Sequence, residues 1–189
     1  MSTIVGIQGD GWCVMGADSR VVEDDRVYVT PKKAGKIINR PGYIIAIAGN
    51  WRPAQILAHQ LQYPKPPAFT TIEALDGFVT SEFIPTMKDA YLDNGFSNEG
   101  EDATDAMLAI CGTIYEIGSD WSWLRDVNNL YAIGSGSAYA LGSLVSLATL
   151  TGLTDIDDAT TKAKLALEAA CKFDPNTAKP LVIHQQVRK

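Results

Sequence analysis

The residues best suited to chemistry stand at the two ends of a predicted hairpin at the start of the chain. Ser2 and Thr3 precede an apolar, β-branched run, Asp10-Gly11 is a preferred hairpin dipeptide, and a second apolar run ends at Asp18 and Arg20. Because the strands of a hairpin are antiparallel, the start of the first lies beside the end of the second. The sequence therefore predicts that a hydroxyl, a carboxylate and a guanidinium group meet at one end of this hairpin.

Other kinds of catalytic site have little support in the sequence. The only histidines, His59 and His184, are more typical of surface or core positions than of catalysis, and no serine has the glycines of a nucleophile elbow. No spacing of ligand residues suggests a metal site, and no nucleotide-binding loop is present. We therefore expect neither a metal nor a cofactor.

Composition and charge narrow the class of protein. The 189 residues, of which 46% are hydrophobic, predict a single domain spanning residues 1–189 with a substantial core. A net charge of -6 without a basic stripe argues against nucleic acid and anionic membranes as partners. The apolar runs are too short for a membrane span, the N-terminus lacks signal-peptide features, and the three cysteines are scattered. These features predict a cytoplasmic protein with reduced thiols.

The first fifty residues read as about five short strands joined by tight turns. The hairpin is followed by three further strand-like segments, residues 21–30, 36–39 and 43–48. None of the connections is long enough for a helical crossover between parallel strands, so we expect an antiparallel sheet.

Two helices are predicted next. The first covers residues 51–61. The second begins at a capping box formed by Thr70 and Glu73 and ends at Asn94-Gly95, with a kink expected at Pro85.

The second half of the chain repeats the order of strands and helices. Strands within residues 106–115 and 128–133 lead to a glycine-rich corner, residues 134–137. A helix follows whose apolar face should carry Leu141, Leu144, Val145 and Ala148. A second helix runs from an acidic start at residues 154–158 to residue 173, and residues 180–184 form a closing strand. This order predicts an α+β fold, a four-layer αββα sandwich of two stacked antiparallel sheets flanked by helix pairs.

Several short segments, in this order along the chain, resemble the proteasome β-subunit and HslV peptidase family. They are Ser2-Thr3-Ile4-Val5, residues 16–20 (Gly-Ala-Asp-Ser-Arg), Lys36-Ile37, Ala48-Gly49 and residues 134–140 (Gly-Ser-Gly-Ser-Ala-Tyr-Ala). The family belongs to the N-terminal nucleophile hydrolases, which share the αββα sandwich. The resemblance implies a peptidase that acts on polypeptides, assembles into a homo-oligomeric ring, and often depends on an ATP-driven unfoldase.

Ser2 matches the residue that serves this family as nucleophile, where the family has threonine. The resemblance implies that its hydroxyl attacks an amide carbonyl and that its own α-amine takes the proton. A free α-amine has a pKa of about 7.7–8.0, so it can act as a base without a histidine. Removal of Met1 is therefore required, because an acylated nitrogen cannot accept the proton. By itself, Ser2 could equally be only the second residue of a first strand.

The resemblance also assigns supporting roles near the nucleophile. Asp18 and Lys36 match an acid and lysine pair that tunes the nucleophile, and Arg20 matches a residue that supports the aspartate. Lys33 is the alternative lysine, since counting at the family's spacing lands on Ala34. A plain strand-end turn with a local ion pair is the other interpretation of residues 18–20.

The remaining matches concern the oxyanion, the substrate and the amine. Gly49 matches the glycine whose N–H stabilises the oxyanion, although a strand-end glycine would look the same. Ile47 and Val22 fall at positions expected to contact the substrate, Ile47 at the base of the specificity pocket. Ser135 and Asp174 match groups that orient the amine, with Thr177 in place of a family serine.

Two other functions remain open at this level. Serine lacks the methyl group that fixes a threonine rotamer, so the substrate could be a small amide, which would make the protein a non-peptidase amidohydrolase. The chain could also be a catalytically silent assembly protein that keeps the fold.

Overall fold

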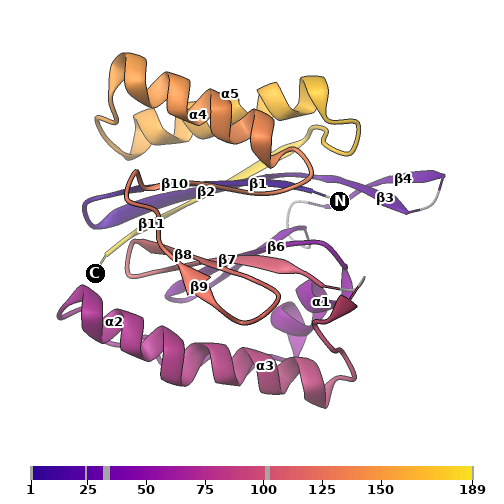
Figure 1. Ribbon diagram of the computed structural model, residues 1–189, viewed down its shortest axis with the longest axis vertical. Coiled ribbons are helices and arrows are strands. Elements are labelled where there is room, and N and C mark those ends of the chain that lie inside the picture. Colours follow the sequence, from indigo (N-terminus) through magenta and orange to yellow (C-terminus); the bar gives the residue numbers. More distant parts are fainter. Residues whose placement is uncertain (1, 24, 32–34, 101–102, 189) are drawn as a thin grey trace.

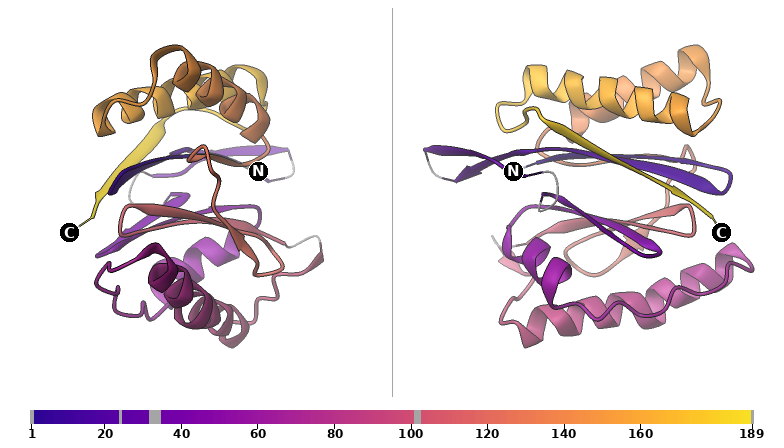
Figure 2. Two further views of the ribbon diagram at one scale, coloured as in Figure 1. Left: turned by 60° about the vertical axis from the view of Figure 1, so that its left-hand side comes forward. Right: turned by 180° about the vertical axis from the view of Figure 1, so that it is seen from behind.

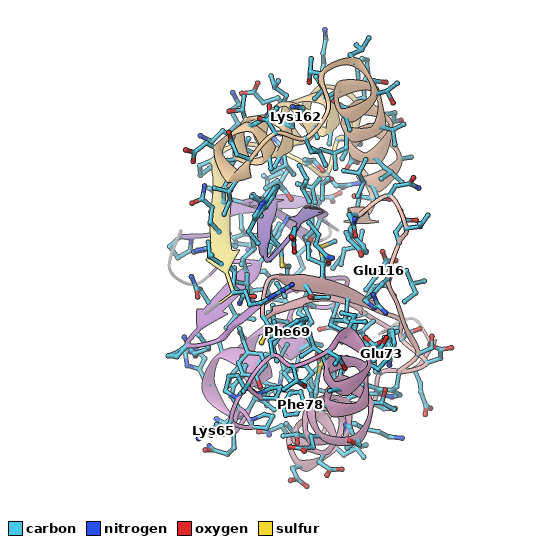
Figure 3. All side chains as sticks on the ribbon, turned by 90° about the vertical axis from the view of Figure 1, so that its left-hand side faces the viewer. Lys65, Phe69, Glu73, Phe78, Glu116 and Lys162 are labelled. Atoms are coloured by element: carbon cyan, nitrogen blue, oxygen red, sulfur yellow. The ribbon has the colours of Figure 1, made fainter. Side chains whose placement is uncertain are left out.

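The computed structural model describes residues 2–23, 25–31, 35–100 and 103–188, and its elements stack in four layers (Figure 1). Helices α4 (Ser137–Thr151) and α5 (Ile156–Phe173) cover one sheet, and helices α1 (Arg52–His59), α2 (Ile72–Phe78) and α3 (Ile84–Asp93) cover the other. In Figure 3, Lys162 marks the first helix layer and Phe78 the second, with both sheets between them. The predicted α+β, αββα sandwich is confirmed.

The opening hairpin forms the centre of the first sheet. Strands β1 (Thr3–Gly9) and β2 (Trp12–Asp18) pair antiparallel, with Ile4 opposite Ala17, and the sheet has the order β10-β1-β2-β11. Its outer strands are β10 (Leu130–Gly134) and β11 (Leu181–Val187). Because helices cover one face and the other sheet covers the opposite face, the central strands β1 and β2 are mostly apolar and buried rather than alternating. The hairpin ends therefore lie within a sheet that is packed on both faces.

The second sheet has the order β5-β6-β7-β8-β9. Its strands are β5 (Ile37–Arg40), β6 (Tyr43–Ala48), β7 (Asp105–Ile110), β8 (Thr113–Ile117) and β9 (Trp123–Leu124). All neighbours that were expected to be antiparallel are antiparallel. The two sheets pack closely, since a Cβ on Gly6 of β1 would lie 2.7 Å from the sulfur of Met107 in β7.

A separate two-stranded ribbon extends beyond the sandwich (Figures 1 and 2). It consists of β3 (Arg20–Glu23) and β4 (Arg26–Val29), with Val22 paired to Val27. The strand-like segment predicted at residues 21–30 therefore divides into two strands, so the described part of the first fifty residues has six strands where about five were expected. Val27 is 58% exposed at the outer part of the ribbon.

The helices over the first sheet bury different amounts of their surface. Helix α5 turns a row of alanines to the sheet, and these alanines are fully buried. In α4 only Ala140 and Leu144 are buried, whereas Leu141 is 37% and Val145 48% exposed. The predicted apolar face of α4 is thus only partly covered. The helix contains no charged residue, so its hydrophobic period cannot indicate which side faces the sheet.

Two of the helices over the second sheet, α2 and α3, form one long rod, with α1 separate from it (Figure 1). The N-cap of α2 is Thr71, which accepts a hydrogen bond from the Ala74 N–H, and not Thr70 as the capping box predicted. Between α2 and α3 lies a π-helical turn, η1 (Val79–Phe83). Pro85 cannot donate to the preceding turn, and the wider π turn ahead of it accommodates the missing bond. Within the described residues, no helix has the length and apolar character needed to cross a membrane.

Replacing Asp155 by alanine is expected to destabilise α5 without affecting the candidate site. Its carboxylate caps the helix by accepting from the N–H groups of Asp157 and Asp158 at 3.0 and 2.9 Å. Loss of such a cap costs about 1 kcal/mol in the free energy of unfolding, measured by urea denaturation. Asp155→Asn should retain most of that stability, and an equal loss in both variants would contradict the capping role.

Candidate active site

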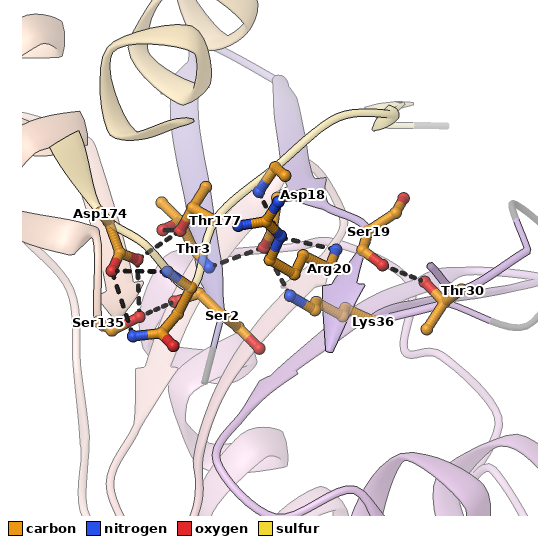
Figure 4. A network of polar contacts seen from close by, with 12 residues as sticks. Ser2, Thr3, Asp18, Ser19, Arg20, Thr30, Lys36, Ser135, Asp174 and Thr177 are labelled. Atoms are coloured by element: carbon orange, nitrogen blue, oxygen red, sulfur yellow. Dashed lines mark hydrogen bonds and ion pairs between the residues drawn. The ribbon is translucent and has the colours of Figure 1, made fainter. Parts of the chain in front are cut away.

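Asp18 lies at the meeting point of the hairpin ends, as predicted (Figure 4). Oδ1 accepts from the Thr3 N–H at 2.9 Å, and Oδ2 accepts from the Arg20 N–H at 2.9 Å and the Ala178 N–H at 3.2 Å. The carboxylate is almost fully buried. Three main-chain donors from three segments therefore hold a negative charge beside the start of β1.

Lys36 completes the set of donors to Asp18. Its Nζ lies 2.6 Å from Asp18 Oδ1, and both side chains are buried. Burial lowers the pKa of the Lys36 ammonium, while the charge of Asp18 and its hydrogen bond oppose that shift. Of the two lysines considered from the sequence, Lys36 is thus paired with Asp18, and Lys33 lies outside the described residues.

Arg20 supports the site in a different way from the expected one. Its main-chain N–H, and not its guanidinium, binds Asp18, while Nη1 donates to the carbonyl of Pro175 at 2.7 Å. The side chain therefore connects the start of β3 to the segment that follows α5. Because Asp174 precedes Pro175, Arg20 links the surroundings of the two carboxylates.

Ser2 lies in a close-fitting cradle formed by the glycine-rich corner. It is 5% exposed, and a Cβ on Gly134, whose φ is +91°, would lie only 2.0 Å from the Ser2 carbonyl oxygen. The hydroxyl of Ser135 lies 3.4 Å from the same oxygen. Glycine at position 134 thus permits both the backbone conformation and the approach of the Ser2 main chain.

Asp174, at the C-terminal end of α5, accepts hydrogen bonds from two hydroxyl groups. It lies on the side of Ser2 opposite to Asp18 (Figure 4). Its Oδ2 accepts from Ser135 Oγ at 2.8 Å and from Thr177 Oγ1 at 2.5 Å, and the Asn176 N–H binds Oδ1 at 3.2 Å. Burial alone would raise the pKa of this carboxyl, but the hydrogen bonds from Thr177, Ser135 and Asn176 lower it below its ordinary value. Thr177, the residue expected in place of a family serine, therefore gives Asp174 a second hydroxyl donor beside Ser135.

Thr3, the other hydroxyl residue at the start of the chain, is fully buried and lies 2.5 Å from the Thr177 hydroxyl. Its side chain is held inside the protein, whereas Ser2 lines an open pocket. This difference favours Ser2 over Thr3 as the residue that can meet a substrate.

A pocket of about 620 Å³ opens beside Ser2, and we call it the Ser2 pocket. It is lined by Ser2, Val21, Val22, Glu23, Tyr28, Val29, Thr30, Pro31, Gly49, Asn50 and Trp51. Gly49 has a φ of +122°, and a Cβ there would lie 2.8 Å from Thr104 Cγ2 and 2.9 Å from the Ala103 carbonyl oxygen. Position 49 therefore requires glycine on both conformational and steric grounds.

Of the two residues expected to contact a substrate, Val22 lines the Ser2 pocket and Ile47 does not. Ile47 is buried in the core between the second sheet and its helices, because alternate residues of β6 point to opposite faces. Tyr28, Val29 and Trp51 were not recognised as pocket residues from the sequence. The apolar residues of the 21–30 segment, which follow the Asp18–Arg20 turn directly, were the available signal.

The histidines lie away from this arrangement. Within the described residues, both His59 and His184 line a different pocket of about 480 Å³, where Asn39 Nδ2 is 3.1 Å from His184 Nδ1. The Ser2 site instead combines a hydroxyl residue, a buried cation and two carboxylates. Such a set can activate a hydroxyl by nearby charge, provided that a separate base takes its proton.

No family model and no curated protein matches the sequence. Solved structures match the fold over almost the whole chain. They show that the chain has the αββα fold of HslV- and proteasome-type proteins, as the sequence resemblance implied.

Three of these structures illustrate the likeness. Thiobacillus denitrificans BPH in complex with epoxomicin has a TM-score of 0.72 and 20% identity, covering 99% of each chain. Eukaryotic HslV from Trypanosoma brucei has a TM-score of 0.65 and 17% identity, covering 98% of this chain and 99% of that one. Anbu, an ancestral β-subunit from Yersinia bercovieri, has a TM-score of 0.70 and 13% identity, covering 98% of this chain and 81% of that one.

Proposed function

We propose that this protein is an N-terminal nucleophile peptidase that hydrolyses peptide bonds with Ser2. The observation that carries the proposal is the position of Ser2. It lines an open pocket together with Gly49, while the residue beside it binds the buried Asp18 and Lys36 pair. The HslV- and proteasome-type fold supports the same assignment.

In the proposed reaction, removal of Met1 first frees the α-amine of Ser2. The amine accepts the hydroxyl proton as Ser2 Oγ attacks the carbonyl carbon of the substrate peptide bond. The resulting oxyanion is stabilised by the Gly49 N–H. The protonated amine then donates to the leaving nitrogen, the C–N bond breaks, and an ester to Ser2 remains. Water, deprotonated by the same amine, attacks the ester and regenerates the free hydroxyl.

The neighbouring groups tune this sequence of proton transfers. The ammonium of Lys36 favours the negative charge that develops on the attacking oxygen, and Asp18 keeps the lysine charged and in place. Ser135, whose hydroxyl lies near the Ser2 carbonyl oxygen and donates to Asp174, orients the amine together with that carboxylate. No histidine is required, because an α-amine titrates near neutral pH.

The pocket and the fold indicate the substrate and the setting. Four of the walls are Val21, Val22, Val29 and Trp51, so a large apolar side chain of a polypeptide fits best. By likeness to HslV- and proteasome-type proteins, we propose a cytoplasmic homo-oligomeric ring that receives unfolded chains, with an ATP-dependent unfoldase as its partner.

The proposal is tested by intact-mass analysis with epoxomicin, the compound bound to the BPH of Thiobacillus denitrificans. Wild-type protein should lack Met1 and gain one adduct, and Ser2→Ala should gain none. An epoxyketone can bond to a hydroxyl oxygen and an adjacent free amine, so the adduct reports both groups. Ser2→Thr should still be labelled.

Protein that lacks Met1 but forms no adduct would contradict the proposal. Protein that retains Met1 would be a silent assembly protein in that form. Cleavage of small amides without cleavage of unfolded polypeptides would instead indicate a non-peptidase amidohydrolase.

Val22→Phe should narrow the Ser2 pocket and change the choice of substrate. We expect kcat/KM for peptides with Phe or Leu before the cleaved bond to fall about 10- to 100-fold, with a smaller fall for Ala, because a pocket discriminates by volume. The measurement is hydrolysis of matched fluorogenic peptides.

Val27→Phe is the matched control, because Val27 pairs with Val22 across the ribbon but does not line the pocket. Its peptide preference should equal that of wild type. A parallel change in both variants would show that the ribbon as a whole, and not the Val22 side chain, sets the preference.

A further inference from the structure

Thr3 binds Asp18 directly and is linked to Asp174 through Thr177, although it does not line the Ser2 pocket. Its N–H donates to Asp18 Oδ1 at 2.9 Å, and its Oγ1 lies 2.5 Å from Thr177 Oγ1, which is itself bonded to Asp174. The residue is completely buried. It is therefore the point where the main chain next to the nucleophile is fixed from two sides.

The direction of the hydroxyl bonds follows from the number of protons available. An ionised carboxylate can only accept, so the Thr177 hydroxyl must donate its single proton to Asp174. The bond between the two threonines then has only one arrangement, in which Thr3 Oγ1–H donates to Thr177 Oγ1. This gives a directed chain from Thr3 through Thr177 to Asp174, in which each bond polarises the next.

Gly136 is independent evidence that the hydrogen-bonded groups of Thr3, Thr177 and Asp174 are closely packed. A Cβ at this position would lie 2.2 Å from Thr3 Oγ1, 3.0 Å from Asp174 Oδ2 and 3.1 Å from Thr177 Oγ1. The φ of Gly136 is -92°, which any residue can adopt. Glycine is thus needed here for space and not for its backbone conformation.

We infer that Thr3 is a positioning residue, whose hydroxyl acts through Thr177 to hold Asp174 in its bond with Ser135, the residue whose hydroxyl lies 3.4 Å from the Ser2 carbonyl oxygen. The inference deepens the proposed function and rests on it for its catalytic consequence. The hydrogen-bonded arrangement itself can be tested without any activity.

The expected charge effects follow from the surroundings of Asp174. Lys36, just ahead of β5, lies close enough to be affected by its charge, and Arg20 of β3 binds the adjacent Pro175 carbonyl. Hydrogen bonds depress the pKa of Asp174 in the folded protein, so its ionised form stabilises the fold above the unfolded pKa of about 3.9. This contribution is lost as the pH falls through the folded pKa. Removing the Thr3 hydroxyl should weaken the hydrogen bonds from Thr3 through Thr177 to Asp174. The stabilisation from ionised Asp174 should then begin to be lost at a higher pH.

The first measurement is therefore the unfolding temperature of Thr3→Val between pH 7 and pH 3. Valine keeps the β-branched shape but cannot donate. The unfolding temperature of Thr3→Val should lie furthest below that of wild type above about pH 5, and the difference should disappear toward pH 3. Thr3→Ser should restore the wild-type pH profile, and in an Asp174→Asn background Thr3→Val should show no pH-dependent gap.

The second measurement is peptide hydrolysis by the same variants. Thr3→Val should lower kcat about 3- to 10-fold with little change in KM, and the acidic limb of the kcat profile should move to higher pH. Thr3→Ser should recover at least half of the activity. A residue that only packs the core would not move the pH profile.

Gly136→Ala tests the same contact from the opposite side. Its pH profiles of unfolding temperature and of kcat should match those of Thr3→Val, because its methyl group displaces Thr3 Oγ1. Gly142→Ala is the matched control in α4, the helix that Gly136 precedes, since a Cβ at position 142 meets nothing within 4 Å. It should leave the profile unchanged.

The outcomes separate the two levels of the proposal. A pH-independent gap in unfolding temperature, or a Thr3→Val profile identical to wild type, overturns the inference whatever the activity. The expected gap together with a wild-type protein that cleaves no peptide supports the Thr3 arrangement and contradicts the proposed function. The expected gap together with the kcat shift supports both.

Discussion

Replacing Lys36 by methionine is expected to lower peptide hydrolysis by about 10²- to 10⁴-fold, the range typical of losing a group that assists proton transfer. It should also destabilise the protein by about 3 kcal/mol, because it leaves the buried Asp18 carboxylate without its cation. The three main-chain donors that remain on Asp18 keep this loss at the lower end of the range for buried ion pairs. Urea unfolding and kcat/KM on one fluorogenic peptide measure the two effects.

Lys179→Met provides a matched control, because Lys179 makes an ion pair with Glu168 at the same N–O distance of 2.6 Å. The side chains of that pair are 64% and 45% exposed, so solvent screens the charges. The change should cost less than about 1 kcal/mol and leave hydrolysis unchanged. Equal losses in the two variants would show that burial of the Lys36 pair has no special consequence.

The double variant Asp18→Asn with Lys36→Met sharpens the test. Since the two residues share one interaction, their effects on stability should not add, and the double variant should be more stable than the sum of the single losses predicts. Additive losses would mean that each side chain acts through different partners.

Gly49→Ala is the second change with a large expected effect. A methyl group at a φ of +122° would be strained, and it would also meet Thr104 and the Ala103 carbonyl at less than 3.0 Å. We expect a loss of about 10²- to 10³-fold in kcat, as for removal of one oxyanion donor, together with about 1–3 kcal/mol of stability. The readouts are kcat on a fluorogenic peptide and urea unfolding.

Gly95→Ala separates strain from catalysis. Gly95 follows α3 with a φ of +70°, and a Cβ at this position would meet nothing within 4 Å. The variant should lose about 1–2 kcal/mol of stability while keeping kcat. If Gly49→Ala lost only stability and kept kcat, the proposed oxyanion role of its N–H would be wrong.

The opening hairpin was predictable because several local signals agreed. The β-branched runs, the Asp10-Gly11 turn and the apolar character of both strands all specify one register, so the neighbourhood of Asp18 followed from the sequence. The layer order also followed, since each predicted run of strands or helices was long enough to form its own layer.

The details that differ from prediction depend on packing between distant segments. Helix α4 has no charged residue and no clear apolar face, so its contact with the sheet decides that Leu144 is buried and Val145 is not. The N-cap of α2 differed by one residue because Thr70 and Thr71 have equal capping chemistry. Neither choice is encoded in hydrophobic period or residue type alone.

In the candidate site too, contacts within one hairpin were predictable from the sequence, whereas contacts between distant segments were not. The proximity of Ser2 and Asp18 came from one hairpin, but the pairing of Lys36 with Asp18 depends on how the two sheets stack. The bond from Arg20 to the Pro175 carbonyl joins residues 155 positions apart, which a turn motif cannot predict. Ile47 lies in an unbroken apolar run, where no alternation of residue types indicates which face of the strand its side chain occupies.

The enclosure of Ser2 has a practical consequence for purification. The glycine corner packs closely on the Ser2 carbonyl, and Ser2 lines the Ser2 pocket, so an affinity tag fused ahead of Met1 would be joined to the chain beside this pocket. Such a tag would also block the amine that the proposed reaction needs. At the other end of the chain, Val187 is 61% exposed at the end of β11. Recombinant protein for functional assays should therefore carry its tag after β11.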